Sequence, residues 1–247
     1  MDLATRVQSI KPEVRRSPLP GFEYLSGYGV FASPFESGDV LALRVFPVND
    51  FAPYRTVWHR TPQGAWSIYV DSPRLEIACP RYYAAAVEWT GPARISLKWI
   101  GPSQLLVEMD NPRLEWTISM TSGPLMRLMN AMSLSIPEPL WRTPLLLRAF
   151  ERMGSLLLNM GDVSLSGKAP NGQYSIMMPR QMFPITSATA RLSGEDFGKP
   201  VRSKENPAIG ELRLPARPVF AIGQGYFKIR DPEEYRRTVA ELRPAPA

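Results

Sequence analysis

Residues 93–121 read ARISLKWIGPSQLLVEMDNPRLEWTISMT, and this stretch decides the fold that the sequence predicts. It holds three runs in which apolar and polar residues alternate, separated by Gly-Pro-Ser at 101–103 and Asp-Asn-Pro at 110–112. Alternation of period two, interrupted about every ten residues by turn residues, is typical of antiparallel strands joined by tight turns. One face of these strands and the run before them collects Trp89, Leu97, Trp99, Val107, Leu114 and Trp116, and the other collects Glu88, Lys98, Glu108 and Glu115.

Strand-like runs continue on both sides of this stretch. They begin near residue 21, are separated by turns at 36–38 and 61–64, and resume after residue 160 with a turn at Asn171-Gly172. Between them, residues 124–160 place apolar side chains at helical spacing, and Thr143, Pro144 and Gly161 are the residue types of a helix cap, first turn and end. The sequence therefore predicts a mainly β protein, an antiparallel barrel or curved sandwich with a two-helix insertion.

The predicted organisation is a single domain. A polar arm covers residues 1–20, and the β domain with its insertion at about 124–160 covers 21–230. A terminal helix and tail cover 231–247, with Asp231 as the expected cap of that helix.

Composition excludes several function classes. The net charge of +6 is dispersed, and residues 21–123 carry 8 basic and 10 acidic side chains, a balance of −2. The basic side chains do not form a stripe interleaved with aromatic residues, which is the pattern of a nucleic-acid-binding surface, so we expect no nucleic-acid partner. A single cysteine, Cys79, and a single histidine, His59, exclude an internal disulfide and argue against a zinc site. The N-terminus lacks the apolar core of a signal peptide, which makes the cytoplasm the expected location.

Cofactor motifs are also missing from the sequence. Gly27-Tyr28-Gly29 superficially matches a dinucleotide fingerprint, but a helix should follow such a motif and another strand is predicted here. There is no Walker loop and no nucleophile elbow. We therefore expect neither a cofactor nor a metal.

Two sets of residues are candidates for acid–base chemistry. His59 lies in a predicted strand, opposite in facing to Trp58, and could act as a general base if a carboxylate such as Asp71 or Glu76 adjoins it. Glu88 and Glu108 are the second set. They would have raised pKa values if they faced an apolar interior, whereas on a solvent face they would form cross-strand charge pairs. The sequence leaves both arrangements open.

Candidate ligand contacts are aromatic, cationic or sulfur-containing side chains. Aromatic and methionine side chains line adaptable apolar pockets, and arginine or tyrosine can bind a carbonyl group. These candidates are Trp58, Arg60, Tyr82, Tyr83, Trp99, Trp116, Met129 and Arg180.

Three patches of the sequence carry a resemblance to known proteins. VWHRTPQGAWSIYVD (57–71), CPRYY (79–83) and SGKAPNGQYSIMMPR (166–180) resemble a family of bacterial proteins to which no function is attached. In architecture alone, the predicted fold is similar to the lipocalin-like barrels that include carotenoid hydratases and some cyclases. The paired aromatic signature at the N-terminus of the hydratases is absent, so the resemblance transfers no catalytic residue.

Together these observations lead to one functional hypothesis and two alternatives. The first is a cavity in the β-barrel for an apolar or amphiphilic small molecule such as an isoprenoid, polyketide or lipid. The second is a cofactor-independent isomerase, hydratase, lyase or cyclase acting on such a molecule. The third is a membrane-surface or protein-interaction module that uses the helical insertion. The sequence does not indicate an oligomeric state.

Overall fold

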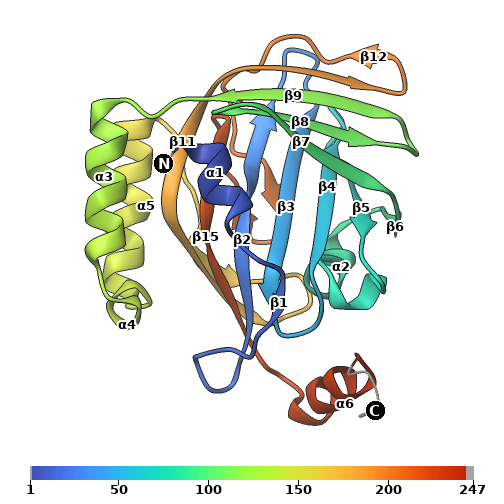
Figure 1. Cartoon of the computed structure of the whole chain (residues 1–247), viewed down its shortest axis with the longest axis vertical. Coiled ribbons are helices and arrows are strands. Elements are labelled where there is room, and N and C mark those ends of the chain that lie inside the picture. The colour runs from blue at the N-terminus through green and yellow to red at the C-terminus, as the bar shows by residue number, and fades with distance from the viewer. Residues whose placement is uncertain (1, 243–247) are drawn as a thin grey trace.

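The structure, a computed structural model, describes residues 2–242. Within this range thirteen strands form one sheet, and β13 and β14 form a separate hairpin. Figure 1 shows the sheet curled into a half-barrel, with α3, α4 and α5 at one side and α6 at one end. The fold is mainly β with a helical insertion, as predicted. The strands are β1 (Glu13–Val14), β2 (Phe22–Pro34), β3 (Val40–Asn49), β4 (Tyr54–Arg60), β5 (Trp66–Asp71), β6 (Trp89–Pro92), β7 (Ile95–Gly101), β8 (Gln104–Met109), β9 (Leu114–Met120), β10 (Ser166–Lys168), β11 (Tyr174–Leu192), β12 (Glu195–Asp196), β13 (Ala208–Ile209), β14 (Leu212–Arg213) and β15 (Val219–Lys228).

The longest helices are α3 and α5 of the insertion and the C-terminal α6. They are α1 (Leu3–Gln8), α2 (Pro80–Tyr83), α3 (Pro124–Ser135), α4 (Glu138–Trp141), α5 (Pro144–Leu158) and α6 (Pro232–Leu242), with 3-10 turns η1 (Leu75–Ile77) and η2 (Ala84–Ala86). No helix in residues 2–242 is long and apolar enough to cross a membrane.

The order of strands explains why the sheet curls. Across the sheet they follow β6-β5-β4-β3-β2-β15-β11-β9-β8-β7, so β6 and β7 lie at opposite edges. Only residues 93 and 94 separate these two strands in the chain, which forces the edges toward each other. No ladder joins them among the described residues. Instead, Arg55 Nη1 donates to the carbonyl of Ile95 (2.9 Å) and the Ile95 N–H donates to Asp71 (3.2 Å). The half-barrel is therefore held near closure by side chains.

The three alternating runs within residues 93–121 form β7, β8 and β9, an antiparallel meander. Val107 and Trp116 are paired and buried, while Lys98 and Glu108 form an ion pair of 2.7 Å on the solvent side. The preceding run differs from the prediction. Residues 84–86 form a 3-10 turn, and the strand begins only at Trp89, which pairs in parallel with β5 and is 45% exposed.

The helical insertion covers an open edge of β11. This strand pairs with β15 up to Pro184 but with β9 only from Ile185 onward. Over the uncovered part, Asn130 of α3 forms two hydrogen bonds with the backbone of Met182, at 2.8 and 2.9 Å. The insertion thus satisfies polar backbone groups that an exposed strand edge would leave unpaired.

The second predicted helix is α5, and its two ends agree only in part with the sequence-based expectation. Pro144 occupies the first turn as expected, but the Thr143 hydroxyl donates to the carbonyl of Leu140 instead of capping the helix. The helix ends at Leu158, and the residue that caps its end is Asn159 and not the expected Gly161; Asn159 adopts a left-handed conformation with φ of 51°. The prediction for the last helix is confirmed, since Asp231 accepts hydrogen bonds from the N–H groups of Glu233 and Glu234.

Side chains fill the inside of the curl. Alternate residues of β3, such as Leu41 and Leu43, pack there with Trp116 and with residues of β7 to β9. The segment predicted as a polar arm contributes α1, whose Leu3 and Val7 join this core because they are four residues apart on one helical face. A second core lies on the opposite face of the sheet, and it contains the candidate site.

Candidate functional site

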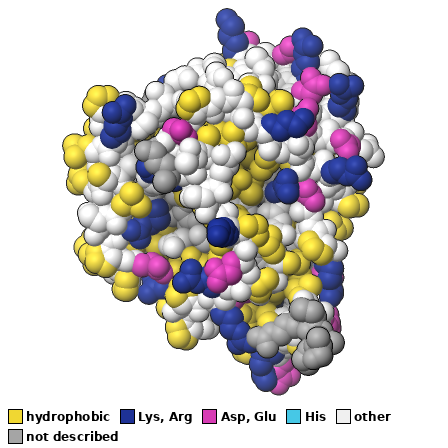
Figure 2. Space-filling view, in the orientation of Figure 1, with side chains coloured by type: hydrophobic (Ala, Val, Ile, Leu, Met, Phe, Trp, Pro, Cys, Tyr) yellow, Lys and Arg dark blue, Asp and Glu magenta, His cyan; other side chains and the backbone are white. Residues whose placement is uncertain are grey.

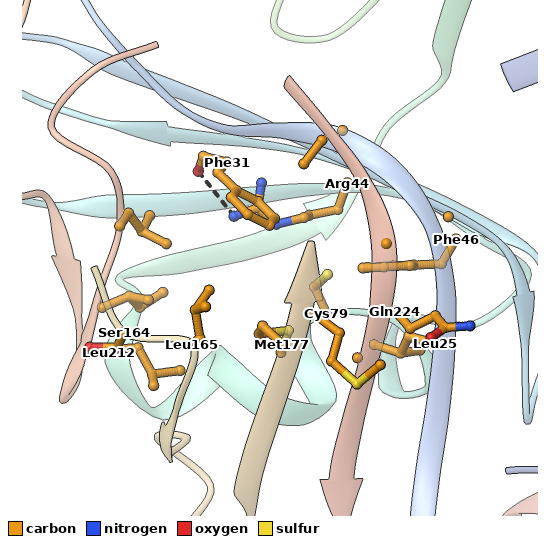
Figure 3. Close-up of a pocket in the computed structure, with 18 of the residues that line it drawn as sticks. Leu25, Phe31, Arg44, Phe46, Cys79, Ser164, Leu165, Met177, Leu212 and Gln224 are labelled. Atoms are coloured by element: carbon orange, nitrogen blue, oxygen red, sulfur yellow. Dashed lines mark hydrogen bonds between the residues drawn. The ribbon is translucent and has the colours of Figure 1, made fainter. Parts of the chain in front are cut away.

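A largely apolar cavity, partly open to solvent, lies on the face of the sheet opposite the filled interior. Strands β2, β3, β4, β11 and β15 form its floor, and its cover consists of α2, the loop at 163–165 and the β13–β14 hairpin. Figure 3 shows Met177 and Cys79 in the middle of the cavity, with Leu165 and Leu212 on one side and Leu25 and Phe46 on the other. The space open to the centre of a water molecule is about 80 Å³, room for roughly five to eight water-sized groups. This location differs from the predicted one inside the barrel.

The hollow exists because the floor lacks side chains at its centre. Gly27 of β2 pairs with Gly223 of β15, Gly29 pairs with Ala221, and Gly225 pairs with Leu25. A Cβ atom at Gly27 would lie 1.9 Å from the carbonyl oxygen of Val45, so no larger residue fits there without moving the backbone. Small residues on two adjacent central strands therefore leave space that the cover does not fill.

One charged side chain, Arg44 of β3, extends along the cavity wall (Figure 3). Its Nη2 donates to the carbonyl of Phe31 (3.0 Å), and its Nη1 donates to the carbonyls of Val30 and Leu43. The guanidinium lies over the rings of Phe31 and Trp58, at 5.3 and 5.1 Å from their centroids. Burial lowers the pKa of Arg44, although arginine keeps its charge at neutral pH.

The other ionisable groups around Arg44 are neutral. Burial raises the pKa of the Cys79 thiol, which is 2% exposed, and raises those of Tyr54 and Tyr83 as well. At neutral pH none of the three is an anion. Trp58 is held in place by the hydrogen bond from its Nε1 to the Thr56 hydroxyl (2.9 Å). The cavity thus combines an ordered aromatic wall with one uncompensated positive charge.

The helix α2 is fixed over the sheet by a buried ion pair. Glu23 of β2 is 1% exposed and accepts hydrogen bonds from Arg81, with 2.8 Å to Nη2, and from the Tyr82 hydroxyl (2.7 Å). The Tyr82 ring stacks on Phe227, with centroids 3.8 Å apart. Tyr82 therefore supports the cover and does not line the cavity. Of the predicted ligand contacts, Trp58 and Tyr83 do line it.

His59 lies on the other side of the sheet. Its Nε2 is 2.6 Å from Asp39 and its ring stacks on Phe197 at 5.5 Å. The predicted partners are elsewhere: Asp71 binds Arg55, and Glu76 binds Arg74. Both expected pairings are therefore wrong, and Asp39 is the carboxylate that the fold brings to the histidine.

Glu88 and Glu108 do not form a catalytic cluster. Glu88 is exposed just before β6, and Glu108 pairs with Lys98 on the solvent face of β8. The arrangement with both carboxylates facing an apolar interior is therefore wrong, because the curl turns the opposite faces of these strands inward.

The remaining predicted contacts have structural surroundings. Trp116 is fully buried inside the curl, and Trp99 is half-buried at the border of an open depression beside α1. Arg180 donates from Nη2 to the carbonyls of Leu134 and Ile136 and lies over Trp141. Met129 is buried in α3, and the guanidinium of Arg60 lies beside the turn at Gly64. None of these five residues lines the cavity.

Arg44, Phe31 and the glycines of the floor are functional candidates that only the structure reveals. A signal was present for Arg44, since it is the one charged residue in VLALRVFPV (40–48), a run too apolar for a solvent-facing strand. The glycines were considered only as a nucleotide motif. Their pairing across β2 and β15 is a long-range contact that no local pattern announces.

The described residues offer no group of three or more histidine, cysteine, aspartate or glutamate side chains able to hold a metal ion. No protein-family model and no curated protein matches the chain at a significant level.

Proposed function

We propose that the protein binds an apolar or amphiphilic small molecule in the cavity between the sheet and its α2 cover. The observation that carries this proposal is the partly covered hollow above the glycines of β2 and β15, walled by Leu, Met, Phe and Trp side chains. Concave, largely apolar sites with a few polar groups are the usual form of small-molecule sites. The cavity lining in residues 2–242 contains no carboxylate and no histidine, which favours binding over acid–base catalysis.

Native mass spectrometry of protein purified gently from its own host tests this proposal, followed by solvent extraction of the bound material. We expect a stoichiometric apolar adduct. A Cβ at Gly225 would meet Met177 and Leu25, which line the cavity, so Gly225→Val fills part of it. A Cβ at Gly123 meets nothing within 4 Å, which makes Gly123→Val the matched control.

The adduct should be lost in Gly225→Val and kept in Gly123→Val. Retention of the full adduct in Gly225→Val, with native circular dichroism, would place the ligand elsewhere. Absence of any adduct, together with no binding of added apolar compounds, would refute the proposal.

We propose as a second function that the helical insertion docks on an anionic membrane surface. In the space-filling view apolar side chains gather at the side where α3 to α5 lie (Figure 2). Eight large apolar side chains of this block are at least half exposed: Leu125, Leu128, Met132, Leu134, Leu140, Leu145, Leu156 and Leu157. An apolar patch of this kind on a chain surface marks an interaction site.

The charges of the block favour an anionic partner. Arg148 and Arg152 are exposed on α5 beside Leu145 and Leu156. The acidic residues of the block turn inward, where Glu151 accepts a hydrogen bond from the N–H of Leu165 (2.7 Å) and Glu138 one from the hydroxyl of Tyr226. A second copy of this face would bring arginines together, whereas anionic lipid would neutralise them.

Co-sedimentation with phosphatidylserine-containing and purely zwitterionic vesicles tests the second function. We expect binding to the anionic vesicles only, weakened by salt. Leu145→Ser with Leu156→Ser should reduce it more than tenfold, and Arg148→Gln with Arg152→Gln by about tenfold or more. Ile100→Ser, at a similarly exposed apolar residue on β7, should change nothing. Absence of binding at low salt would reject this function.

A further inference from the structure

Among the described residues, Arg44 is the arginine of the cavity lining that has no carboxylate partner; Arg180, half-buried over Trp141, has none either but lies outside the cavity. Arg81, 13% exposed, pairs with Glu23, and Arg142, 18% exposed, pairs with Glu138. Arg44 has no ion pair within residues 2–242, although it is only partly exposed and lines an apolar cavity. A buried charge is normally paired, so the position of Arg44 calls for an anion from outside the chain.

The guanidinium also retains unused donors. Its described hydrogen bonds go to three backbone carbonyls of β2 and β3, through Nη1 and one N–H of Nη2. The Nε–H and the second Nη2–H have no partner among the described residues. The contacts with Phe31 and Trp58 restrain the guanidinium plane, so an incoming group would meet an already ordered, forked donor.

The rest of the cavity defines the tail of such a ligand. Leu25, Met177 and Leu212 present apolar surface, and the available space fits a chain of roughly five to eight carbons. One guanidinium balances one negative charge. A carboxylate carries a single charge and a planar pair of oxygens, whereas a phosphate monoester would bring nearly two charges.

We propose that the cavity selects a medium-chain amphiphilic carboxylate whose head group pairs with Arg44 and whose tail lies over the glycine floor. This inference rests on the proposed binding function. It adds the chemical class of the ligand and the residue that recognises it.

Calorimetric titration of the purified, delipidated protein with octanoate, octan-1-ol and octylamine tests the inference. At neutral pH we expect octanoate to bind about 10- to 100-fold more tightly than octan-1-ol, the range for a charged hydrogen-bonded contact, and octylamine to bind weakest. Arg44→Met keeps an apolar side chain of similar length and should remove the preference for the acid while leaving the alcohol bound.

Arg213 provides the matched control. It also lines the cavity, but at the surface, where it pairs with Asp162 at 3.0 Å. Arg213→Met should leave the preference for octanoate intact. A preference that disappears in Arg213→Met and persists in Arg44→Met would overturn the assignment.

The outcomes separate the two proposals. If none of the three compounds binds the wild-type protein, and no native adduct is found, the proposed binding function itself fails. If the acid and the alcohol bind equally, the cavity stands but the role of Arg44 is refuted. This comparison uses wild-type protein, so it decides the matter even if Arg44→Met does not fold.

Discussion

Replacing Arg81 by methionine should destabilise the protein strongly, because it isolates a buried carboxylate. Glu23 is 1% exposed, and Arg81 contacts it from Nη2 at 2.8 Å and from Nε at 3.1 Å. In the variant only the Tyr82 hydroxyl still donates to the carboxylate. The charge of Glu23 must then lose its counter-ion or take up a proton, and either event costs free energy.

The magnitude follows from the burial of the pair. Breaking a buried ion pair by removing one partner costs about 3–5 kcal/mol, and the guanidinium also leaves the ring of Phe51, 5.1 Å away, a contact of about 1 kcal/mol. For a domain of this size, 1 kcal/mol lowers the Tm by about 2–4 °C. The expected decrease in Tm is therefore roughly 8–24 °C.

Thermal and urea unfolding of Arg81→Met, Glu23→Gln and the double variant measure this effect. The double variant should be more stable than the sum of the single changes predicts, since it leaves no isolated charge. Arg113→Met, which breaks an exposed ion pair of 2.6 Å with Glu115, should cost no more than about 1 kcal/mol. Equal costs for Arg81→Met and Arg113→Met would refute the reasoning that burial sets the energy.

Three other outcomes follow from buried polar groups. Asp50 is 2% exposed and accepts a hydrogen bond from the Tyr235 hydroxyl, but burial raises its pKa to about 6. The carboxyl group of Asp50 therefore binds a proton more tightly in the folded protein than in the unfolded chain. In urea titrations, the stability of wild type relative to Asp50→Asn should fall by roughly 2 kcal/mol as the pH rises from about 4 to about 6, and a flat difference would contradict the shift. Cys79, buried with a raised pKa, should react with iodoacetamide at least about 100-fold more slowly in native protein than in denaturant; similar rates would show that the thiol is accessible. His59→Gln should lower the free energy of unfolding by about 1–3 kcal/mol, through its contact with Asp39, yet leave octanoate binding unchanged, because His59 lies across the sheet from the cavity; weaker binding would show that the histidine reaches the ligand.

Local patterns in the sequence predicted most of the elements. The alternation at 93–121 became β7, β8 and β9 with the polar set facing solvent, and the apolar repeats at 124–160 became helices. Residues 84–91 resemble one strand in the sequence, but the three alanines at 84–86 show no alternation of apolar and polar side chains that would support a strand. They form a 3-10 turn, followed by a strand parallel to β5.

The candidate site was predictable only in fragments. Trp58 and Tyr83 were named and do line the cavity, but the acid–base candidates were assigned to a barrel interior that side chains fill. The sequence places His59 on a strand and predicts which face of the strand it lies on, but it does not identify the carboxylate next to it. That carboxylate is Asp39, because β3 and β4 pair so that Leu41 lies beside His59, and Asp39 is two residues from Leu41.

The spacing of apolar residues and the positions of turn-forming residues thus determined by themselves where most strands, turns and helices lie, since these elements depend on contacts within a few residues. The tertiary structure alone decided which face of the sheet is filled and which is hollow. The two-residue link between the outer strands curls one face onto itself, and glycines more than 190 positions apart, such as Gly27 and Gly223, meet on the other. Arg44 acquires its significance only there, because a charge lacks a partner only with respect to neighbours that the fold supplies.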